Sequence, residues 1–199
     1  MTKILLTGAG GLLGTNLKIQ TDRPHRNELN ITKKIEPKPY DLVIHGAAYT
    51  EVEGAETNRM TAFDVNVRGT LNLLEAYPTT PFVYISSEYA HKPVNFYSVT
   101  KSLAEQLVMT HPNFLIIRTL FKPRPWKYPK AFVDQWTQGD YVDVIAPMIE
   151  KEIENWDKKS KLIYIGTGRK TIYDLARQTR KVEKMFIKDV KIKLPADYE

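Results

Sequence analysis

Short apolar runs alternate with longer amphipathic stretches through the first 118 residues of the chain. Four runs have the length and composition of buried strands, and they lie at 4–6, 40–45, 81–85 and 113–118. Between the last three, apolar residues recur at helical spacing, across 57–76 and again from 97 to 108. Strands that alternate with helices form parallel sheets covered on both faces, so the pattern predicts an α/β, Rossmann-type doubly wound parallel sheet.

The pattern is less regular in two places. After residue 14 the first helix has room for about one more turn, 19–22 reads equally as a strand or a loop, and a short helix is expected around 33–35. Beyond 122, prolines interrupt the pattern. The elements expected there are helices at 131–138 and 143–157, a strand at 162–165 and a helix at 171–185.

The composition fits a single globular domain, 1–199, with a proper core, since 42% of the 199 residues are hydrophobic and 26% are charged. Cysteine is absent and the four histidines lack metal-ligand spacing, so we expect neither disulfides nor a metal. No run is long enough to cross a membrane and no signal pattern is present, which favours a cytoplasmic protein without a membrane partner.

The net charge of +6 suits a polyanionic ligand such as a nucleotide. Because lysine and arginine are spread along the chain, nucleic acid is the less favoured partner. A local basic cluster with prolines and aromatic residues lies at 122–130, and we interpret it mostly as solvated surface.

A glycine-rich turn at 7–14 connects the first apolar run to the start of a helix. Glycine lets the backbone turn tightly and approach a pyrophosphate, and free N–H groups at a helix start carry partial positive charge. The spacing Gly8-x-x-Gly11-x-x-Gly14 differs from the common G-x-G-x-x-G fingerprint. Its place after an N-terminal strand nevertheless favours a dinucleotide site over a plain turn.

The residues that follow bear on the choice of dinucleotide. A carboxylate at the end of the second strand favours a free ribose 2′-hydroxyl, whereas arginine favours a 2′-phosphate. Asp22 is followed by Arg23, His25 and Arg26, so the sequence offers both chemistries. The basic residues, Arg23 first, favour NADP(H) over NAD(H), and a polar surface loop is the competing interpretation.

Tyr97 and Lys101 are four residues apart on a predicted helix, so their side chains share a face. An ammonium beside a phenol lowers the phenol pKa and makes tyrosine a usable proton donor or acceptor. Ser87 lies just past a strand, where such sheets place their ligands, and its hydroxyl could hold a carbonyl. Asn66 lies inside a helical stretch, where asparagine is disfavoured unless it is exposed or has a buried polar partner.

The order of these features resembles the extended short-chain dehydrogenase/reductases, and within them the dTDP-4-dehydrorhamnose reductase group of nucleotide-sugar reductases. The matching stretches are TGAGGLLG at 7–14, ELNIT at 28–32, HGAAYTEVEGAE at 45–56, VNVRGTLNLLEA at 65–76, YISSEYA at 84–90, PVNFYSVTK at 93–101 and IIRT at 116–119. The piece GAAYTEVEGAE points to this group rather than to the superfamily at large.

The resemblance implies that NADPH delivers hydride to C4 of a 4-keto-6-deoxy sugar linked to a nucleoside diphosphate. Tyr97 would protonate the alkoxide, while Lys101 would hold the nicotinamide ribose and lower the Tyr97 pKa. Ser87 would bind the carbonyl oxygen, and Asn66 would anchor a water in the proton relay. The other cofactor contacts implied are Gly8, Gly11, Leu12, Leu13, Gly14, Asn30, Ile31, Ala47 and Ala48. The substrate contacts implied besides Ser87 are Thr50, Val52, Glu88 and Phe121.

The chain also departs from this family. Nine residues separate Ser87 from Tyr97, where the family has a longer substrate-facing loop, and 120–199 leaves only a small substrate-binding subregion. Two alternatives therefore stand beside the reductase: an epimerase or dehydratase that recycles NAD, and a non-catalytic NADP-binding regulatory subunit like that of methionine adenosyltransferase. In the family, helices corresponding to 57–76 and 97–110 often form a dimer interface, so the resemblance is compatible with a homodimer.

Overall fold

Five parallel strands form the central sheet of the protein, which a computed structural model describes for residues 2–198. Their order is β1-β2-β3-β4-β9, with bounds Ile4–Thr7, Leu42–His45, Phe82–Ile85, Phe114–Arg118 and Lys161–Tyr164. Every residue of β2 and β3 is buried, as expected of central strands covered on both faces. The predicted strands and the parallel α/β architecture are confirmed.

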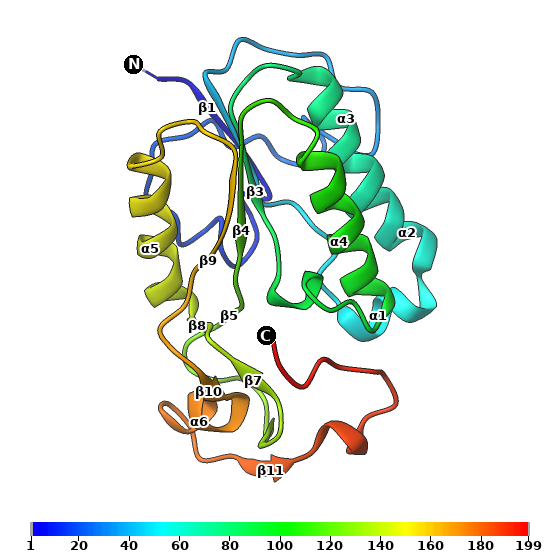
Figure 1. Ribbon diagram of the computed structural model, residues 1–199, viewed down its shortest axis with the longest axis vertical. Helices are drawn as coiled ribbons and strands as arrows, with labels where there is room; N and C mark the ends of the chain where they lie inside the picture. The colour runs from blue at the N-terminus through cyan, green and yellow to red at the C-terminus, as the bar shows by residue number, and fades with distance from the viewer. Residues whose placement is uncertain (1, 199) are drawn as a thin grey trace.

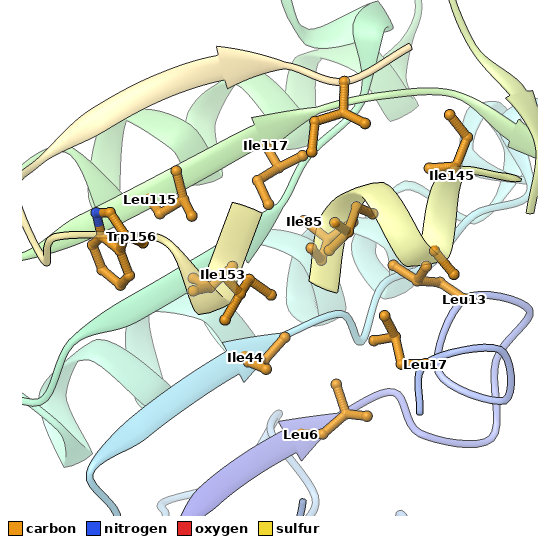
Figure 2. Close-up of a cluster of buried hydrophobic side chains, with 14 of the residues drawn as sticks. Leu6, Leu13, Leu17, Ile44, Ile85, Leu115, Ile117, Ile145, Ile153 and Trp156 are labelled. Atoms are coloured by element: carbon orange, nitrogen blue, oxygen red, sulfur yellow. The ribbon is translucent and has the colours of Figure 1, made fainter. Parts of the chain in front are cut away.

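Helices cover the sheet on its two faces (Figure 1). α5 (Val142–Glu154) lies on one side, and α3 (Gly69–Ala76) and α4 (Phe96–Val108) lie on the other. Under α5, side chains of the helix such as Ile145 meet strand residues such as Ile117 in a dry core (Figure 2). A second core lies between the sheet and the helices α3 and α4. The two cores fix the sheet, so the strand ends form a stable platform for a site.

The predicted helix over 57–76 is helical but divided. α1 (Val52–Thr57) and α2 (Arg59–Phe63) precede one π-helical turn, Asp64–Arg68, which runs into α3. Asn66 lies in this π turn and is 1% exposed. Such single-turn irregularities occur frequently at functional sites, because they re-aim one side chain without ending the helix.

The start of α4 is fixed by a capping box. The Asn95 side chain accepts a hydrogen bond from the Ser98 N–H (2.8 Å), and the Ser98 hydroxyl oxygen accepts one from the Asn95 N–H (3.0 Å). Ser98 therefore closes the start of the helix. The cap places Tyr97 in the first turn of α4.

The segment after the glycine turn does not form the expected helix. One helical turn remains, in which the N–H of Thr15 donates to the Gly11 carbonyl (3.0 Å) and that of Leu17 to the Leu13 carbonyl (3.1 Å). The second strand is reduced to one bridge between Asp22 and Leu5. No helix is present around 33–35 either. The first α/β unit is thus reduced to little more than β1 and its turn.

Beyond β4, β9 completes the main sheet and α5 packs against it, and the other segments form a small C-terminal unit of two-stranded pairings. β5 (Phe121–Lys122) pairs with β8 (Asp140–Tyr141), β6 (Lys130–Phe132) with β11 (Glu183–Met185), and β7 (Trp136–Thr137) with β10 (Lys170–Thr171). The predicted helix at 131–138 is therefore wrong, because this stretch pairs with segments near the C-terminus. The helix predicted over 171–185 is α6 (Ile172–Arg177), and it ends well before 185. No helix within 2–198 is long and apolar enough to cross a membrane.

Candidate active site

A cleft of about 1200 Å³ runs along the carboxyl ends of the parallel strands. It is walled by the glycine turn after β1, the loop 46–52 after β2, Ser86 and Ser87 after β3, and 119–123 after β4. The predicted site residues that line it are Gly8, Gly11, Leu12, Leu13, Gly14, Arg23, Asn30, Ile31, Ala47, Ala48, Thr50, Val52, Ser87, Tyr97 and Phe121. Asn66, Glu88 and Lys101 are buried outside that lining.

The glycine turn packs against the loop after β2. Gly8 has a φ of +77°, and a Cβ there would lie 2.5 Å from the Ala47 nitrogen. A Cβ at Gly14 would lie 2.5 Å from the Gly8 carbonyl oxygen. Both positions therefore require glycine for steric reasons within the protein itself.

The same turn offers backbone donors to the cleft. Several of its N–H groups donate no hydrogen bond within 2–198, among them those of Gly10, Leu12 and Leu13. Where a Cβ would stand at Gly10, no heavy atom lies within 4 Å. Unpaired amides on an open, glycine-lined wall are the donor set that phosphate oxygens bind.

Arg23 is used differently from the expectation. Its guanidinium donates to the carbonyls of Gly14 (2.7 Å), Leu17 (2.7 Å) and Ile19 (3.2 Å), and to the Thr21 hydroxyl (3.0 Å). These carbonyls end the shortened helical turn and would otherwise have no partner. Arg23 still lines the cleft, but its main contacts hold the shortened segment together.

The two other charged groups of this segment separate. The Asp22 carboxylate accepts the Tyr40 hydroxyl and lines a neighbouring cavity instead of the main cleft. Arg26 and His25 line the main cleft. The Arg26 guanidinium is exposed and makes no hydrogen bond or ion pair with any described residue. Arg26, the cation of this segment without a partner, therefore lines the main cleft, while the Asp22 carboxylate lines the neighbouring cavity.

Ser87 and Tyr97 both line the cleft, and their side chains lie close enough to interact. Ser87 continues β3 in an extended conformation (φ −130°, ψ 147°), and its hydroxyl accepts the Tyr89 N–H (3.2 Å). Burial raises the pKa of Tyr97, and a hydrogen bond with the Ser87 side chain opposes that rise. The expected lowering of the Tyr97 pKa is therefore wrong for this structure, and the phenol keeps its proton at neutral pH.

Lys101 contacts the end of β3. Its ammonium donates to the Ile85 carbonyl (2.9 Å) and lies 4.2 Å from the centre of the Tyr84 ring. Burial lowers the pKa of Lys101 to about 7, and the Glu105 carboxylate opposes this. The structure thus places the lysine against the end of β3, where it supports the strand that carries Ser87.

Glu105 is a part of the site that the sequence reasoning missed. Its carboxylate is fully buried, accepts the Ser86 hydroxyl (2.5 Å) and forms an ion pair with Arg118 (2.6 Å). It follows Lys101 by four residues on α4, so helical spacing alone offered a signal for it. The pair joins α4 to the ends of β3 and β4, directly behind the cleft.

Asn66 joins two neighbouring elements. Its side-chain oxygen accepts the Tyr49 N–H (2.7 Å), and its amide donates to the Tyr49 carbonyl (3.2 Å) and the Thr100 hydroxyl (2.8 Å). Of the two sequence interpretations, the buried polar partner is confirmed. The contacts hold the loop after β2 against α4, so Asn66 positions Tyr97 through its helix.

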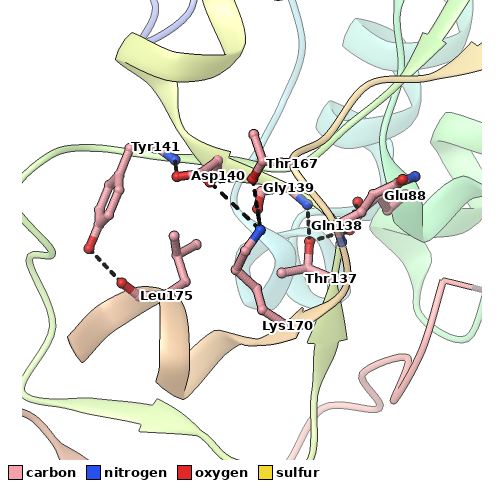
Figure 3. A network of polar contacts seen from close by, with 9 residues as sticks. All are labelled: Glu88, Thr137, Gln138, Gly139, Asp140, Tyr141, Thr167, Lys170 and Leu175. Carbon is pink, nitrogen blue, oxygen red and sulfur yellow. Dashed lines mark hydrogen bonds and ion pairs between the residues drawn. The ribbon is translucent and has the colours of Figure 1, made fainter. Parts of the chain in front are cut away.

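Glu88 does not line the cleft, although we expected it beside the substrate. Its carboxylate accepts the Thr137 hydroxyl (2.6 Å) and the Gln138 N–H (3.2 Å), which joins the end of β3 to the C-terminal unit (Figure 3). Burial raises the pKa of Glu88 to about 6, although the hydrogen bonds from Thr137 and Gln138 act to lower it. Its partner lies 49 positions along the chain, and the local sequence pattern contains no signal for that contact.

The cleft also contains residues that the sequence reasoning did not assign to it. Glu51, Tyr89, Lys122 and Lys127 all line it, and the two lysines come from the basic cluster interpreted as solvated surface. Within 2–198, no group of three or more histidine, aspartate or glutamate side chains could hold a metal ion.

A family profile and several curated relatives point to the same family. The profile described as the RmlD substrate binding domain matches residues 1–151. The dTDP-4-dehydrorhamnose reductase of Aggregatibacter actinomycetemcomitans is 31% identical, over 83% of this chain and 68% of that protein. Across several curated reductases of that name, the chain spans between 49% and 68% of the relative's length.

Solved structures of the same group share the fold. The dTDP-4-dehydrorhamnose reductase ortholog of Clostridium acetobutylicum has a TM-score of 0.85 at 23% identity, covering 99% of this chain and 89% of that one. The Bacillus anthracis reductase, solved in complex with NADP, has a TM-score of 0.83 at 22% identity, covering 100% and 90%. The resemblance stated from the motifs and the predicted fold are both confirmed.

Proposed function

Because the chain belongs to the RmlD substrate binding domain family, we propose that it reduces a 4-keto-6-deoxy sugar linked to a nucleoside diphosphate, using NADPH. One observation carries the proposal: Ser87 and Tyr97 meet in the cleft onto which the unpaired amides of the glycine turn open. A carbonyl-binding hydroxyl, a proton donor and a phosphate site therefore share one cavity.

The residues present fit a dinucleotide. The amides of Leu12 and Leu13 would bind the pyrophosphate, and Ala47 and Ala48 leave room for it along the loop after β2. Arg26, which is the free cation of the adjoining wall, would bind a ribose 2′-phosphate in place of Arg23. When bound, NADPH supplies the hydride that reduces the carbonyl carbon.

The protein's own side chains supply the rest. Ser87 donates a hydrogen bond to the carbonyl oxygen, and Tyr97 gives that oxygen a proton as negative charge develops on it. A phenol whose pKa is raised by burial holds its proton at neutral pH, which is the state that a reductase needs. Lys101 and Asn66 hold β3 and α4 in place behind these two groups. The subregion after 120 would enclose the sugar, with Phe121 against it.

The first test is a calorimetric titration of the protein with NADPH and, in parallel, with NADH. We expect tight binding of NADPH and weaker binding of NADH. Oxidation of NADPH is then followed by absorbance against a panel of nucleotide-linked 4-keto-6-deoxy sugars.

The outcomes separate the candidate functions. Binding of neither dinucleotide contradicts the proposal. Purified protein that carries NAD and does not consume it in turnover indicates an epimerase or dehydratase instead. Tight NADPH binding without turnover on any keto sugar indicates a regulatory subunit.

A further inference from the structure

Lys122 occupies an unusual position in the cleft. It is the second residue of β5, directly after Phe121, and its side chain is only partly exposed. The Lys122 ammonium makes no hydrogen bond or ion pair with any residue in 2–198, although its backbone belongs to the β5–β8 pairing. An ammonium held in a cavity without a partner is costly, because burial removes water that would otherwise solvate the charge. Burial accordingly lowers the pKa of Lys122, and the Glu51 carboxylate opposes that shift.

The sheet order separates Lys122 from the glycine turn. β1 carries the turn and β4 leads into β5, with β2 and β3 between them. Three interstrand spacings place the ends of β1 and β4 about 14 Å apart. The amides of the glycine turn and the ammonium of Lys122 are therefore suited to two different anionic groups.

Lys122 lies at the substrate end of the cleft. Ser87 and Thr119 are in register by continuation of the β3–β4 ladder, since the Ser86 N–H donates to the Ile117 carbonyl (2.8 Å) and the Glu88 N–H to the Thr119 carbonyl (3.2 Å). Lys122 follows Thr119 by three residues. Glu51, whose charge acts on Lys122, adjoins the two positions expected to border the sugar.

We propose that Lys122 binds the diphosphate of the nucleotide-sugar substrate, and that the negative charge of Glu51, on the same cleft wall, opposes this binding. The inference rests on the proposed function and names the residue that recognises its substrate class. Phosphate oxygens supply the partner that the ammonium lacks, through charge-assisted hydrogen bonds. The Glu51 carboxylate repels the negative charge of a bound diphosphate, whereas the Lys122 ammonium attracts it. The two residues therefore act in opposite directions on the affinity for the same ligand.

The test is calorimetric titration of dTDP into protein saturated with NADP⁺, so that the dinucleotide covers the glycine turn. We expect Lys122→Met to weaken dTDP binding about 10- to 100-fold, as for loss of a hydrogen bond to a charged group. Glu51→Gln should tighten it about threefold. The charge control is Lys181→Met, an exposed lysine outside the cleft, which should leave dTDP binding unchanged.

Two further readouts keep the inference distinct from a folding defect or a cofactor effect. The Tm of Lys122→Met should not fall, because the change removes an unpaired ammonium, and Lys122→Gln gives a polar second variant. The affinity of either variant for NADP⁺ should match that of the wild type. In turnover, KM for the sugar nucleotide should rise while kcat changes little, as expected for loss of uniform binding.

Unchanged dTDP affinity in both Lys122 variants overturns the inference. So does a loss of NADP⁺ affinity with dTDP binding intact, which would assign Lys122 to the dinucleotide. A wild-type protein that binds NADP⁺ but not dTDP also overturns it. A wild type that binds no dinucleotide contradicts the proposed function itself, and the two failures are therefore distinguishable.

Discussion

The stretch 2–41 and the stretch 42–118 build the two halves of the same cleft in different ways. In the first, a helix is reduced to one turn, a strand to one bridge, and the Arg23 side chain holds the carbonyls that a longer helix would satisfy. In the second, β2 and β3 are buried along their whole length and α4 starts with a capping box. The helices there carry buried polar contacts at Asn66 and Glu105.

The difference follows from what each half has to present. A pyrophosphate is bound by backbone N–H groups, so a short turn that aims a few amides is sufficient. Proton transfer needs one side chain held within a fraction of an ångström, and that requires a helix fixed on several sides. Reduction of the first half is therefore compatible with cofactor binding, whereas a similar reduction of the second would disturb Tyr97.

The largest expected effect is on Tyr97. Tyr97→Phe should lower kcat for the keto sugar about 10³-fold, because the developing oxyanion loses its proton donor. Since a phenyl ring fills the same space, Tm and NADPH affinity should change little. Steady-state turnover and calorimetry on one preparation measure both. Turnover within a factor of ten of wild type would show that another group is the acid.

Removing the charge of Glu105 tests the half of the cleft built by 42–118. Glu105→Gln leaves the Arg118 guanidinium, 12% exposed, without its counter-ion, and should cost about 3 kcal/mol in the free energy of unfolding. Urea denaturation measures it. The matched control is Glu152→Gln, whose partner Lys161 is 38% exposed and which should cost no more than about 1 kcal/mol. Equal effects for the two variants would remove the argument that this network stabilises the site.

Substitution of Arg23 tests the reduced half of the cleft, which is built by 2–41. Arg23→Ala removes the donor to three backbone carbonyls and should destabilise the protein by about 2 kcal/mol, while the preference for NADPH over NADH stays. Arg23→Lys should recover only part of the loss, because one ammonium cannot span carbonyls that a planar guanidinium reaches together. A lost NADPH preference at unchanged stability would restore the expectation that Arg23 binds the 2′-phosphate.

Sequence pattern was sufficient for the central sheet and most of the cleft, because those features are local. Apolar runs reported the strands, and four-residue spacing placed Tyr97 and Lys101 on one helix. The C-terminal unit is different: 131–138 pairs with β10 and β11, and local periodicity there was interpreted as a helix. Its strands are only two or three residues long, so partners distant in the sequence determine their conformation.

Side-chain roles were harder to predict than positions. Arg23 and Arg26 are the same residue type three positions apart, and sequence favoured Arg23 for the phosphate. The carbonyls that accept hydrogen bonds from Arg23 are free to do so only because the first helix stops early. Similarly, the Glu88 carboxylate points away from the cleft because Thr137 and Gln138 supply its donors. In both cases the tertiary surroundings, which no local pattern reports, determine which partner the charge finds.

The smallest expected effect completes the contrast between the two arginines. Arg26→Ala should weaken NADPH binding about tenfold and leave NADH binding and Tm unchanged, because Arg26 makes no contact that holds the fold. Since the side chain is exposed, the difference should shrink as salt is raised from 0.05 to about 0.5 M. Arg177→Ala, an exposed arginine of α6 outside the cleft, is the charge control. Equal weakening of NADPH and NADH would contradict a 2′-phosphate contact, and would leave the reduced half selective for the dinucleotide only through its backbone amides.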